Sequence, residues 1–216
     1  TDSNAFLISP NAGTSNFAGK QCHQNFFVTS YQNDQNFEVL GKYAQDKGFK
    51  RAFLLAPNYQ AGKDAIAGYK RHFKGEIVDE VYTPLGQLDF SAELAKIASA
   101  KPDVLFTFMP GGMGVNLVKQ FRQAGLSSIP FTSAFTTDES TLPAQQDAAL
   151  GFLAGANWAP NMDNPQNKAF VAAFEEAYKA VPGTYAMQSY DAAMLIDSAL
   201  KAGGGKLANR DAIRAA

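Results

Sequence analysis

The sequence predicts an α/β fold in which parallel sheets are flanked by helices. Apolar segments of strand length alternate with segments of helical periodicity over most of the 216 residues. The gaps between strands are long enough for helices, and such βαβ units make the strands parallel and their crossovers right-handed. Hydrophobic residues form 46% of the chain and charged residues 18%, which supplies a packed core and argues against disorder.

The alternation is clearest in the middle of the chain. Apolar residues recur at helical spacing in residues 35–47, 62–73 and 114–124. A further helix is expected after Asp89, which we place at its N-cap, and Lys101-Pro102 is expected to end it. Strands are expected between these helices, over residues 51–56, 76–82, 104–109 and 129–133.

The two ends of the chain follow a different pattern. Residues 5–9 and 151–158 read as strands, but two long helices over 165–178 and 185–201 follow each other with no strand between them. The chain has no initiator Met, and residues 209–216 read as a helix that stops partway, so we interpret the sequence as a fragment.

This change of pattern predicts two lobes. Residues 31–155 are expected to form one complete lobe, because the βαβ alternation covers them. Residues 1–30 and 156–216 are expected to be parts of the other lobe, to which the chain returns after residue 155.

The charge balance excludes several classes of function. Lys and Arg total 19 and Asp and Glu total 20, so the chain lacks the basic face that nucleic acid requires. No apolar stretch approaches the roughly 18 residues that cross a bilayer, and we therefore expect no direct membrane insertion. The single Cys22 is expected to be a buried thiol, with half of a disulfide to a residue outside the sequence as the alternative.

The sequence offers no catalytic or metal-binding constellation. Cys22, His23 and His72 have no metal-ligand spacing, and no Gly-x-Ser-x-Gly nucleophile motif is present. Pro110-Gly-Gly-Met-Gly114 lacks the ending of a phosphate-binding loop. We therefore expect no catalytic residue, no metal and no cofactor, and keep a doubly wound enzyme as the rival interpretation.

The carboxyl ends of the predicted strands point to a ligand crevice. In open parallel sheets ligands bind beyond these ends, and here four of the strands are followed by a loop that mixes small residues with hydroxyl, amide or aromatic residues. The four loops are residues 9–15, 57–62, 110–114 and 133–138. Tyr59 is the most telling residue because an aromatic between turn residues is poorly placed for a core; the alternative is that all four are ordinary turns.

Five groups of segments, in order along the chain, carry a family resemblance. They are Ile8-Ser-Pro-Asn-Ala-Gly-Thr14, Leu54-Leu-Ala-Pro-Asn-Tyr-Gln-Ala-Gly62, Asp89-Phe-Ser91 with Lys101-Pro-Asp103, Gln120-Phe-Arg-Gln-Ala-Gly-Leu126 and Ser189-Tyr-Asp-Ala-Ala193. Together they resemble the type I periplasmic binding proteins, in the branch that binds branched-chain amino acids. The resemblance implies a longer, two-lobed periplasmic receptor that closes on a small-molecule ligand and docks on an ABC-transporter permease.

The resemblance also implies the binding residues. The family's N-lobe loop matches Asn11, Ala12, Gly13 and Thr14, and its cleft tyrosine matches Tyr59. Its second cleft aromatic falls near Met109 and Pro110, and the acidic residue that pairs with an amino acid's ammonium group falls on Phe135.

Phe135 shifts the expected ligand away from amino acids. Without the carboxylate, a bound ammonium group would be buried unpaired, which costs several kcal/mol. Phe108, Met109 and Phe135 offer apolar and aromatic packing for a flat ring, so we expect an aromatic acid or related compound, as in the branch that imports aromatic degradation products. The alternatives are a branched-chain or other amino-acid or amide ligand, with Phe135 as ordinary core, and a ligand-sensing regulatory domain of the same fold.

Overall fold

A computed structural model describes residues 5–215 and divides the chain into two compact units. One unit runs from Asn33 to Ala159. The other joins the residues up to Gln32 to those from Pro160 onward.

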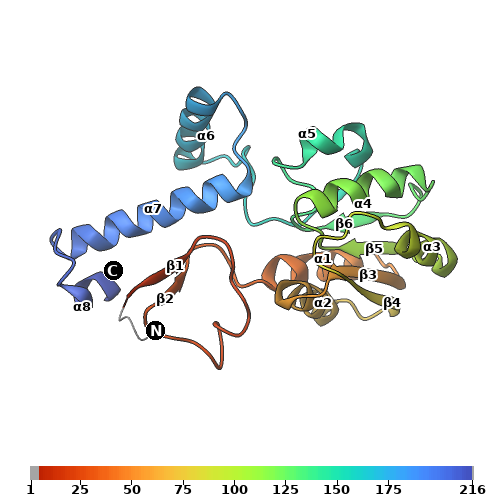
Figure 1. Cartoon of the computed structure of the whole chain (residues 1–216), viewed down its shortest axis with the longest axis horizontal. Coiled ribbons are helices and arrows are strands. Elements are labelled where there is room, and N and C mark those ends of the chain that lie inside the picture. The colour runs from red at the N-terminus through yellow and green to blue at the C-terminus, as the bar shows by residue number, and fades with distance from the viewer. Residues whose placement is uncertain (1–4, 216) are drawn as a thin grey trace. The chain divides into compact units, whose positions relative to one another are not determined.

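The unit of residues 33–159 is built on a five-stranded sheet in which every neighbouring pair of strands is parallel (Figure 1). The strand order is β4-β3-β5-β6-β7. The bounds are Arg51–Pro57 (β3), Glu76–Thr83 (β4), Val104–Thr107 (β5), Phe131–Ser133 (β6) and Leu153–Ala154 (β7). The predicted α/β fold with a parallel sheet is confirmed, and all carboxyl ends of the strands lie at one edge.

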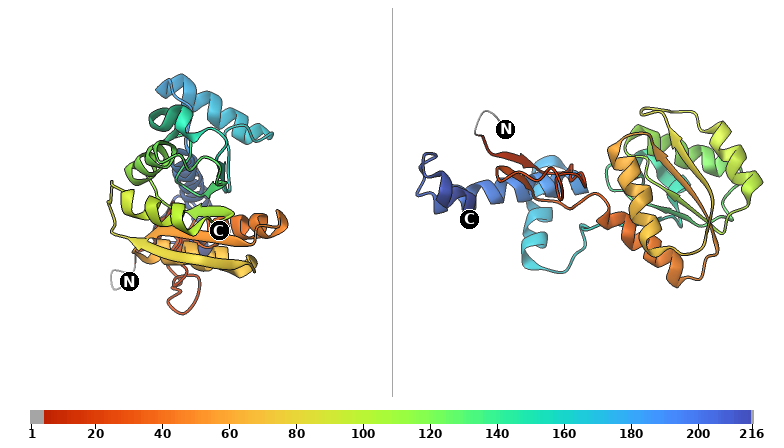
Figure 2. Two further views of the ribbon diagram at one scale, coloured as in Figure 1. Left: turned by 90° about the vertical axis from the view of Figure 1, so that its right-hand side faces the viewer. Right: turned by 90° about the horizontal axis from the view of Figure 1, so that it is seen from below.

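Helical segments precede or connect these strands. They are α1 (Gln35–Asp46), α2 (Gln60–His72), α3 (Ser91–Ala100), α4 (Gly112–Gln123), the short α5 (Leu142–Gln145) and the 3₁₀ turn η1 (Gln146–Ala149). Figure 2 shows α1 and α2 on one face of the sheet and α3 and α4 on the other.

The alternation of side chains along the strands divides the core between these two faces. Phe53 and Leu55 of β3 join the cluster that α3 and α4 bury, whose other members include Leu105 and Phe131. On the opposite face the ring of Phe106 lies 4.5 Å from that of Tyr69 in α2. Because both faces are covered, β3, β5 and β6 are buried almost throughout, as the central strands of a parallel sheet must be.

Within residues 5–32 and 160–215, the second unit holds a short parallel pair of strands and three helices. The strands are β1 (Leu7–Ser9) and β2 (Phe26–Val28), and the helices are α6 (Pro165–Tyr178), α7 (Thr184–Ala202) and α8 (Arg210–Ala215). Helix α6 begins where Asn164 accepts a hydrogen bond from the backbone N–H of Asn167 and Pro165 takes the first helical position. Leu7 is 62% exposed and Leu207 73%, so this unit leaves large apolar side chains uncovered.

Three details differ from the sequence-based expectations. The N-cap of α3 is Phe90 rather than Asp89, although the carboxylate of Asp89 accepts the backbone N–H of Ser91 at 2.9 Å. The strand expected over residues 151–158 is reduced to Leu153–Ala154, which pairs with β6. Cys22 is exposed rather than buried, because it lies at the end of a run of turns whose residues 16–22 are all exposed.

Candidate ligand-binding site

Tyr59 occupies the turn between β3 and α2. It is the N-cap residue of α2 in an extended conformation, and its side chain is half-buried. The turn is tight: a Cβ on Gly62 would lie 1.9 Å from the carbonyl oxygen of Pro57, so only glycine fits there. Burial raises the pKa of the Tyr59 phenol above its usual value, which keeps the hydroxyl protonated and able to donate a hydrogen bond at neutral pH.

An aromatic cluster joins Tyr59 to the loop that follows β6. The ring of Tyr59 stacks on that of Phe108 with 6.1 Å between centroids. Phe108 in turn meets Phe135 edge to face at 6.2 Å, and Phe37 of α1 contacts both, at 5.2 Å and 6.4 Å. These are spacings at which aromatic rings attract one another. We call Phe37, Tyr59, Phe108 and Phe135 the aromatic cluster.

Phe135 is fixed in this cluster by its backbone. Its φ of 58° lies in the left-handed region, which bulky residues rarely adopt and which costs on the order of 1–3 kcal/mol. The next residue is held firmly: the hydroxyl of Thr136 accepts the backbone N–H of Met109 at 2.8 Å, and its carbonyl accepts the side-chain amide of Gln145 at 2.6 Å. The loops after β5 and β6 are therefore tied to each other, and this holds the ring of Phe135 beside Phe108.

Met109 and Pro110 differ in burial. Met109 is fully buried and belongs to the core under α3 and α4, whereas Pro110 is partly exposed. Phe108 directly precedes Met109 and contacts both Tyr59 and Phe135. It is the residue through which this loop joins the aromatic cluster.

Two carboxyl groups follow Phe135. Asp138 caps the turn that follows it, accepting the backbone N–H groups of Ser140 at 2.9 Å and Thr141 at 3.1 Å. Glu139 is half-buried rather than solvated, and burial, with a smaller contribution from the charge of Asp138, raises the pKa of its carboxyl group.

The loop of Asn11, Ala12, Gly13 and Thr14 follows β1 in the other unit. Gly13 lies so close to the backbone of Tyr31 that a Cβ would come within 1.7 Å of its carbonyl oxygen. The side-chain amide of Asn11 donates to the hydroxyl of Tyr31 at 2.9 Å and to the amide oxygen of Gln188 at 2.7 Å. A hollow of about 370 Å³ opens beside Gly13 and Thr14.

Gln188 is a residue that the sequence did not single out. It lies 177 positions from Asn11 and is 1% exposed. The signal was present in the spacing, since Thr184, Met187, Gln188 and Ala192 form the buried stripe of α7. A glutamine on a buried stripe requires a hydrogen-bond partner elsewhere in the fold.

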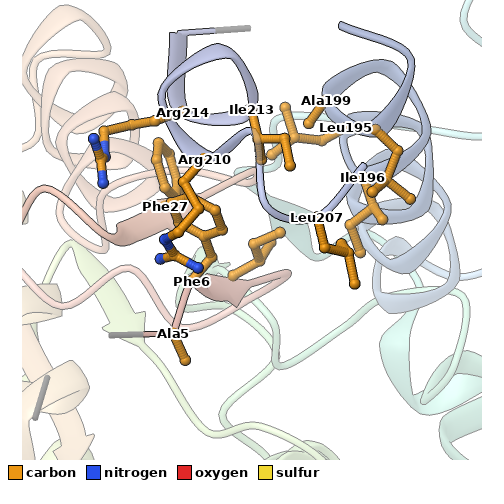
Figure 3. Close-up of a pocket in the computed structure, with 12 residues that line it drawn as sticks. Ala5, Phe6, Phe27, Leu195, Ile196, Ala199, Leu207, Arg210, Ile213 and Arg214 are labelled. Carbon is orange, nitrogen blue, oxygen red and sulfur yellow. The ribbon is translucent and has the colours of Figure 1, made fainter. Parts of the chain in front are cut away.

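A larger hollow in the same unit is apolar. It has a volume of about 610 Å³ and lies between the β1–β2 pair and helices α7 and α8 (Figure 3). The guanidinium group of Arg210 packs 4.1 Å from the ring centre of Phe6, and Arg214 donates to the side chains of Asp211 and Asn25. None of the residues predicted to bind ligand lines this hollow.

Two further kinds of feature among residues 5–215 concern metal ions and the membrane. No group of three or more His, Cys, Asp or Glu side chains in this range is placed to hold a metal ion. No helix among these residues has the length and apolar character to cross a bilayer.

Comparisons with known proteins agree with this architecture. A family model described as periplasmic binding protein matches residues 1–216. The Leu/Ile/Val-binding protein homolog 6 of Brucella melitensis biotype 1 is 32% identical over 98% of this chain and 55% of its own length. The chain thus spans about half the length of the curated relatives it matches.

Two solved structures are similar as well. A solute-binding protein of an ABC transporter from R. palustris, in complex with benzoate, has a TM-score of 0.93 and 35% identity over 97% of this chain and 59% of its own. One from Rhodopseudomonas palustris BisB5, in complex with 3,4-dihydroxybenzoic acid, has a TM-score of 0.89 and 33% identity over 99% of this chain and 60% of its own. The two-lobed type I fold is therefore the one to which these 216 residues contribute, and the chain belongs to the periplasmic binding protein family.

Proposed function

We propose that the complete protein is the extracytoplasmic solute receptor of an ABC importer and that it binds a small aromatic acid between two lobes that close on it. On this proposal residues 33–159 are the second lobe and the other unit is part of the first. The receptor is periplasmic, delivers its ligand to a permease in the membrane, and carries out no chemical step on it.

The observation that carries the choice of ligand is the aromatic cluster. Tyr59, Phe108 and Phe135 lie at the carboxyl edge of the sheet, where ligands of parallel sheets bind, and the ring of Phe108 contacts the rings of the other two. The family resemblance aligns Phe135 with the acidic residue of the amino-acid receptors. An aromatic ring there favours a flat apolar ligand and leaves an ammonium group without a partner.

A ligand carboxylate needs hydrogen-bond donors on this proposal. The four loops at the strand ends contain neither Lys nor Arg, so the donors are the hydroxyl groups of Thr14, Ser15 and Tyr59 together with backbone N–H groups. Hydrogen bonds to an ionised acceptor are worth about 1.5–3 kcal/mol each, so a few of them hold a small anion without a cation.

The relatives support the same choice. The benzoate-binding and dihydroxybenzoate-binding neighbours are 35% and 33% identical to this chain. A third neighbour, from R. palustris in complex with 4-hydroxybenzoate, is 28% identical. The curated relatives are named for leucine, isoleucine and valine, which keeps aliphatic amino acids as the competing ligands.

The test is a thermal-shift panel on the complete protein with benzoates, hydroxycinnamates and aliphatic amino acids. A ligand at a hundredfold its dissociation constant stabilises the protein by about 2.7 kcal/mol, so benzoate or a hydroxybenzoate is expected to raise the melting temperature and leucine is not. A shift with leucine or valine alone would refute the aromatic assignment. Turnover of the bound acid would make the protein an enzyme instead.

A further inference from the structure

Asn11 is oriented by its partners within its own unit. Its amide nitrogen donates one hydrogen bond to Gln188 and one to Tyr31, which uses both N–H hydrogens of the side chain. The NH₂ group of Asn11 is therefore directed at the protein, so it is not a donor for a ligand. What Asn11 contributes to the loop is the placement of its backbone.

Hydroxyl groups fix the next two peptide planes. The hydroxyl of Ser30 donates to the carbonyl oxygen of Asn11 at 2.8 Å, and that of Ser9 donates to the carbonyl oxygen of Ala12 at 2.8 Å. In a planar trans peptide the N–H points away from the C=O. The N–H of Ala12 is thus turned away from Ser30, and that of Gly13 away from Ser9.

This arrangement leaves donors for a ligand. No acceptor for the backbone N–H of Ala12 or Thr14 is found within residues 5–215. Gly13 holds the loop against the carbonyl of Tyr31, where no side chain would fit. The loop is therefore a rigid segment whose backbone offers N–H groups, the kind of donor that suits a carboxylate.

Gln188 is the residue that reaches this loop from a distant part of the sequence. It projects from α7, is 1% exposed, and offers its oxygen to Asn11, while its own amide nitrogen is buried without a partner. An unpaired buried donor is unfavourable, and a methionine of the same length would avoid it. The interaction that only a polar side chain can make here is the hydrogen bond to Asn11.

We infer that Gln188 is a positioning residue for ligand binding, which acts through Asn11 to hold the Ala12–Thr14 backbone in the conformation that receives the ligand's carboxylate. This inference rests on the proposed function, since it assumes that an aromatic acid binds at this loop. Gln188 itself does not touch the ligand.

The experiment compares Gln188→Met with Asn11→Ala and the double variant in the complete protein, using benzoate and isothermal calorimetry. Losing a buried hydrogen bond that orients the donors is expected to weaken benzoate binding about tenfold in Gln188→Met. In the Asn11→Ala background the same change is expected to cost less than about twofold, because its effect passes through Asn11.

Asn167→Leu is the matched control. Asn167 is also a buried amide of this unit, and its nitrogen donates to the carbonyl groups of Pro160 and Met162, near the start of α6 and not in the loop. Asn167→Leu is expected to lower the melting temperature but to leave benzoate affinity within about twofold. Equal losses of affinity in Gln188→Met and Asn167→Leu, or wild-type affinity in Gln188→Met, would overturn the inference.

A ligand-free measurement separates this inference from the proposed function. The amide ¹H–¹⁵N resonances of Ala12 and Thr14 are expected to move in Gln188→Met and to stay in place in Asn167→Leu. If the wild-type protein binds no aromatic acid, the proposed ligand is wrong. Resonances that move in Gln188→Met would then still support the role of Gln188 in positioning the loop. Resonances that stay in place in Gln188→Met contradict it.

Discussion

At the scale of single residues, the candidate site depends on a ring held in an unfavourable backbone conformation. Phe135 has a φ of 58°, and the hydrogen bonds of Thr136 to Met109 and Gln145 hold the following residue in place. Backbone strain of this kind persists where the surrounding structure enforces it, and it is concentrated at binding sites. The position of the ring is therefore set by the fold and not by the preference of phenylalanine.

Replacing Phe135 by leucine is expected to weaken benzoate binding about tenfold, because ring contacts contribute about 0.5–1.5 kcal/mol beyond the area they bury. Phe135→Glu is expected to weaken it more than about a hundredfold, since it also places a carboxylate beside the ligand's own. Calorimetric titration measures both. Phe152→Leu is the control, because Phe152 stacks on Phe131 at 4.1 Å away from the cluster; unchanged affinity in Phe135→Leu would remove Phe135 from the site.

Tyr59 supplies a testable hydroxyl. Tyr59→Phe keeps the ring stacked on Phe108 and removes one hydrogen bond to an ionised acceptor, so benzoate affinity is expected to fall about 10- to 100-fold. Burial raises the pKa of Tyr59 above its ordinary value, so its phenol stays protonated and wild-type affinity is expected to stay constant between pH 6 and pH 9. A fall in affinity between pH 7 and pH 9 would mean that another group controls binding.

At the scale of elements, the spacing of apolar residues along the sequence predicts the helices and their buried faces. The buried positions Phe37, Leu40 and Ala44 recur along α1 at helical spacing, and the start of α6 follows from Asn164 and Pro165. The N-cap of α3 is Phe90, one residue after the expected Asp89. Helix boundaries commonly differ from expectation by such an amount.

The site was predictable only in part. Tyr59 was singled out because an aromatic residue is unusual in a turn, and the structure places its ring against Phe108. The conformation of Phe135 and the contact between Gln188 and Asn11 depend on hydrogen bonds between residues far apart in sequence, 27 positions for Met109–Thr136 and 177 for Asn11–Gln188. No local pattern encodes such pairs, whereas the placement of Gln188 on a buried stripe shows that a partner must exist.

The packing of α1 on α2 provides a prediction for the elements. A Cβ on Gly41 would lie 2.0 Å from the carbonyl oxygen of Tyr69, so Gly41→Ala must push the two helices apart. It is expected to destabilise the protein by about 1–3 kcal/mol. Lys42→Ala on the same helix loses only an exposed pair with Asp46 and is expected to cost less than about 0.5 kcal/mol. Thermal unfolding of Gly41→Ala and Lys42→Ala measures the difference. Equal melting temperatures would mean that α1 and α2 do not pack this closely.

At the scale of the whole molecule, the chain forms two compact units and spans only part of the structures it resembles. It covers 59% of the benzoate-binding neighbour, and its other unit exposes large apolar side chains beside the hollow of Figure 3. We therefore expect further elements of the family fold to pack on this apolar face. The sequence predicts that the chain passes between units after residues 30 and 155, because the alternation of strands and helices covers only residues 31–155. The structure divides the chain after residues 32 and 159.

Trp158 allows closure of the complete protein to be tested. It is the only tryptophan of these 216 residues, it is 8% exposed, and Ala159, the last residue of its unit, directly follows it. Periplasmic binding proteins close on their ligands about a hinge, and a rotation at this passage changes the surroundings of the indole. Titration with benzoate, excited at wavelengths that tryptophan alone absorbs, is expected to give a saturable change in emission whose midpoint equals the calorimetric dissociation constant. Trp158→Phe is expected to reduce that change without altering the affinity more than about twofold. Emission that stays constant while calorimetry reports saturation would show that the passage after residue 159 does not rearrange when the ligand binds.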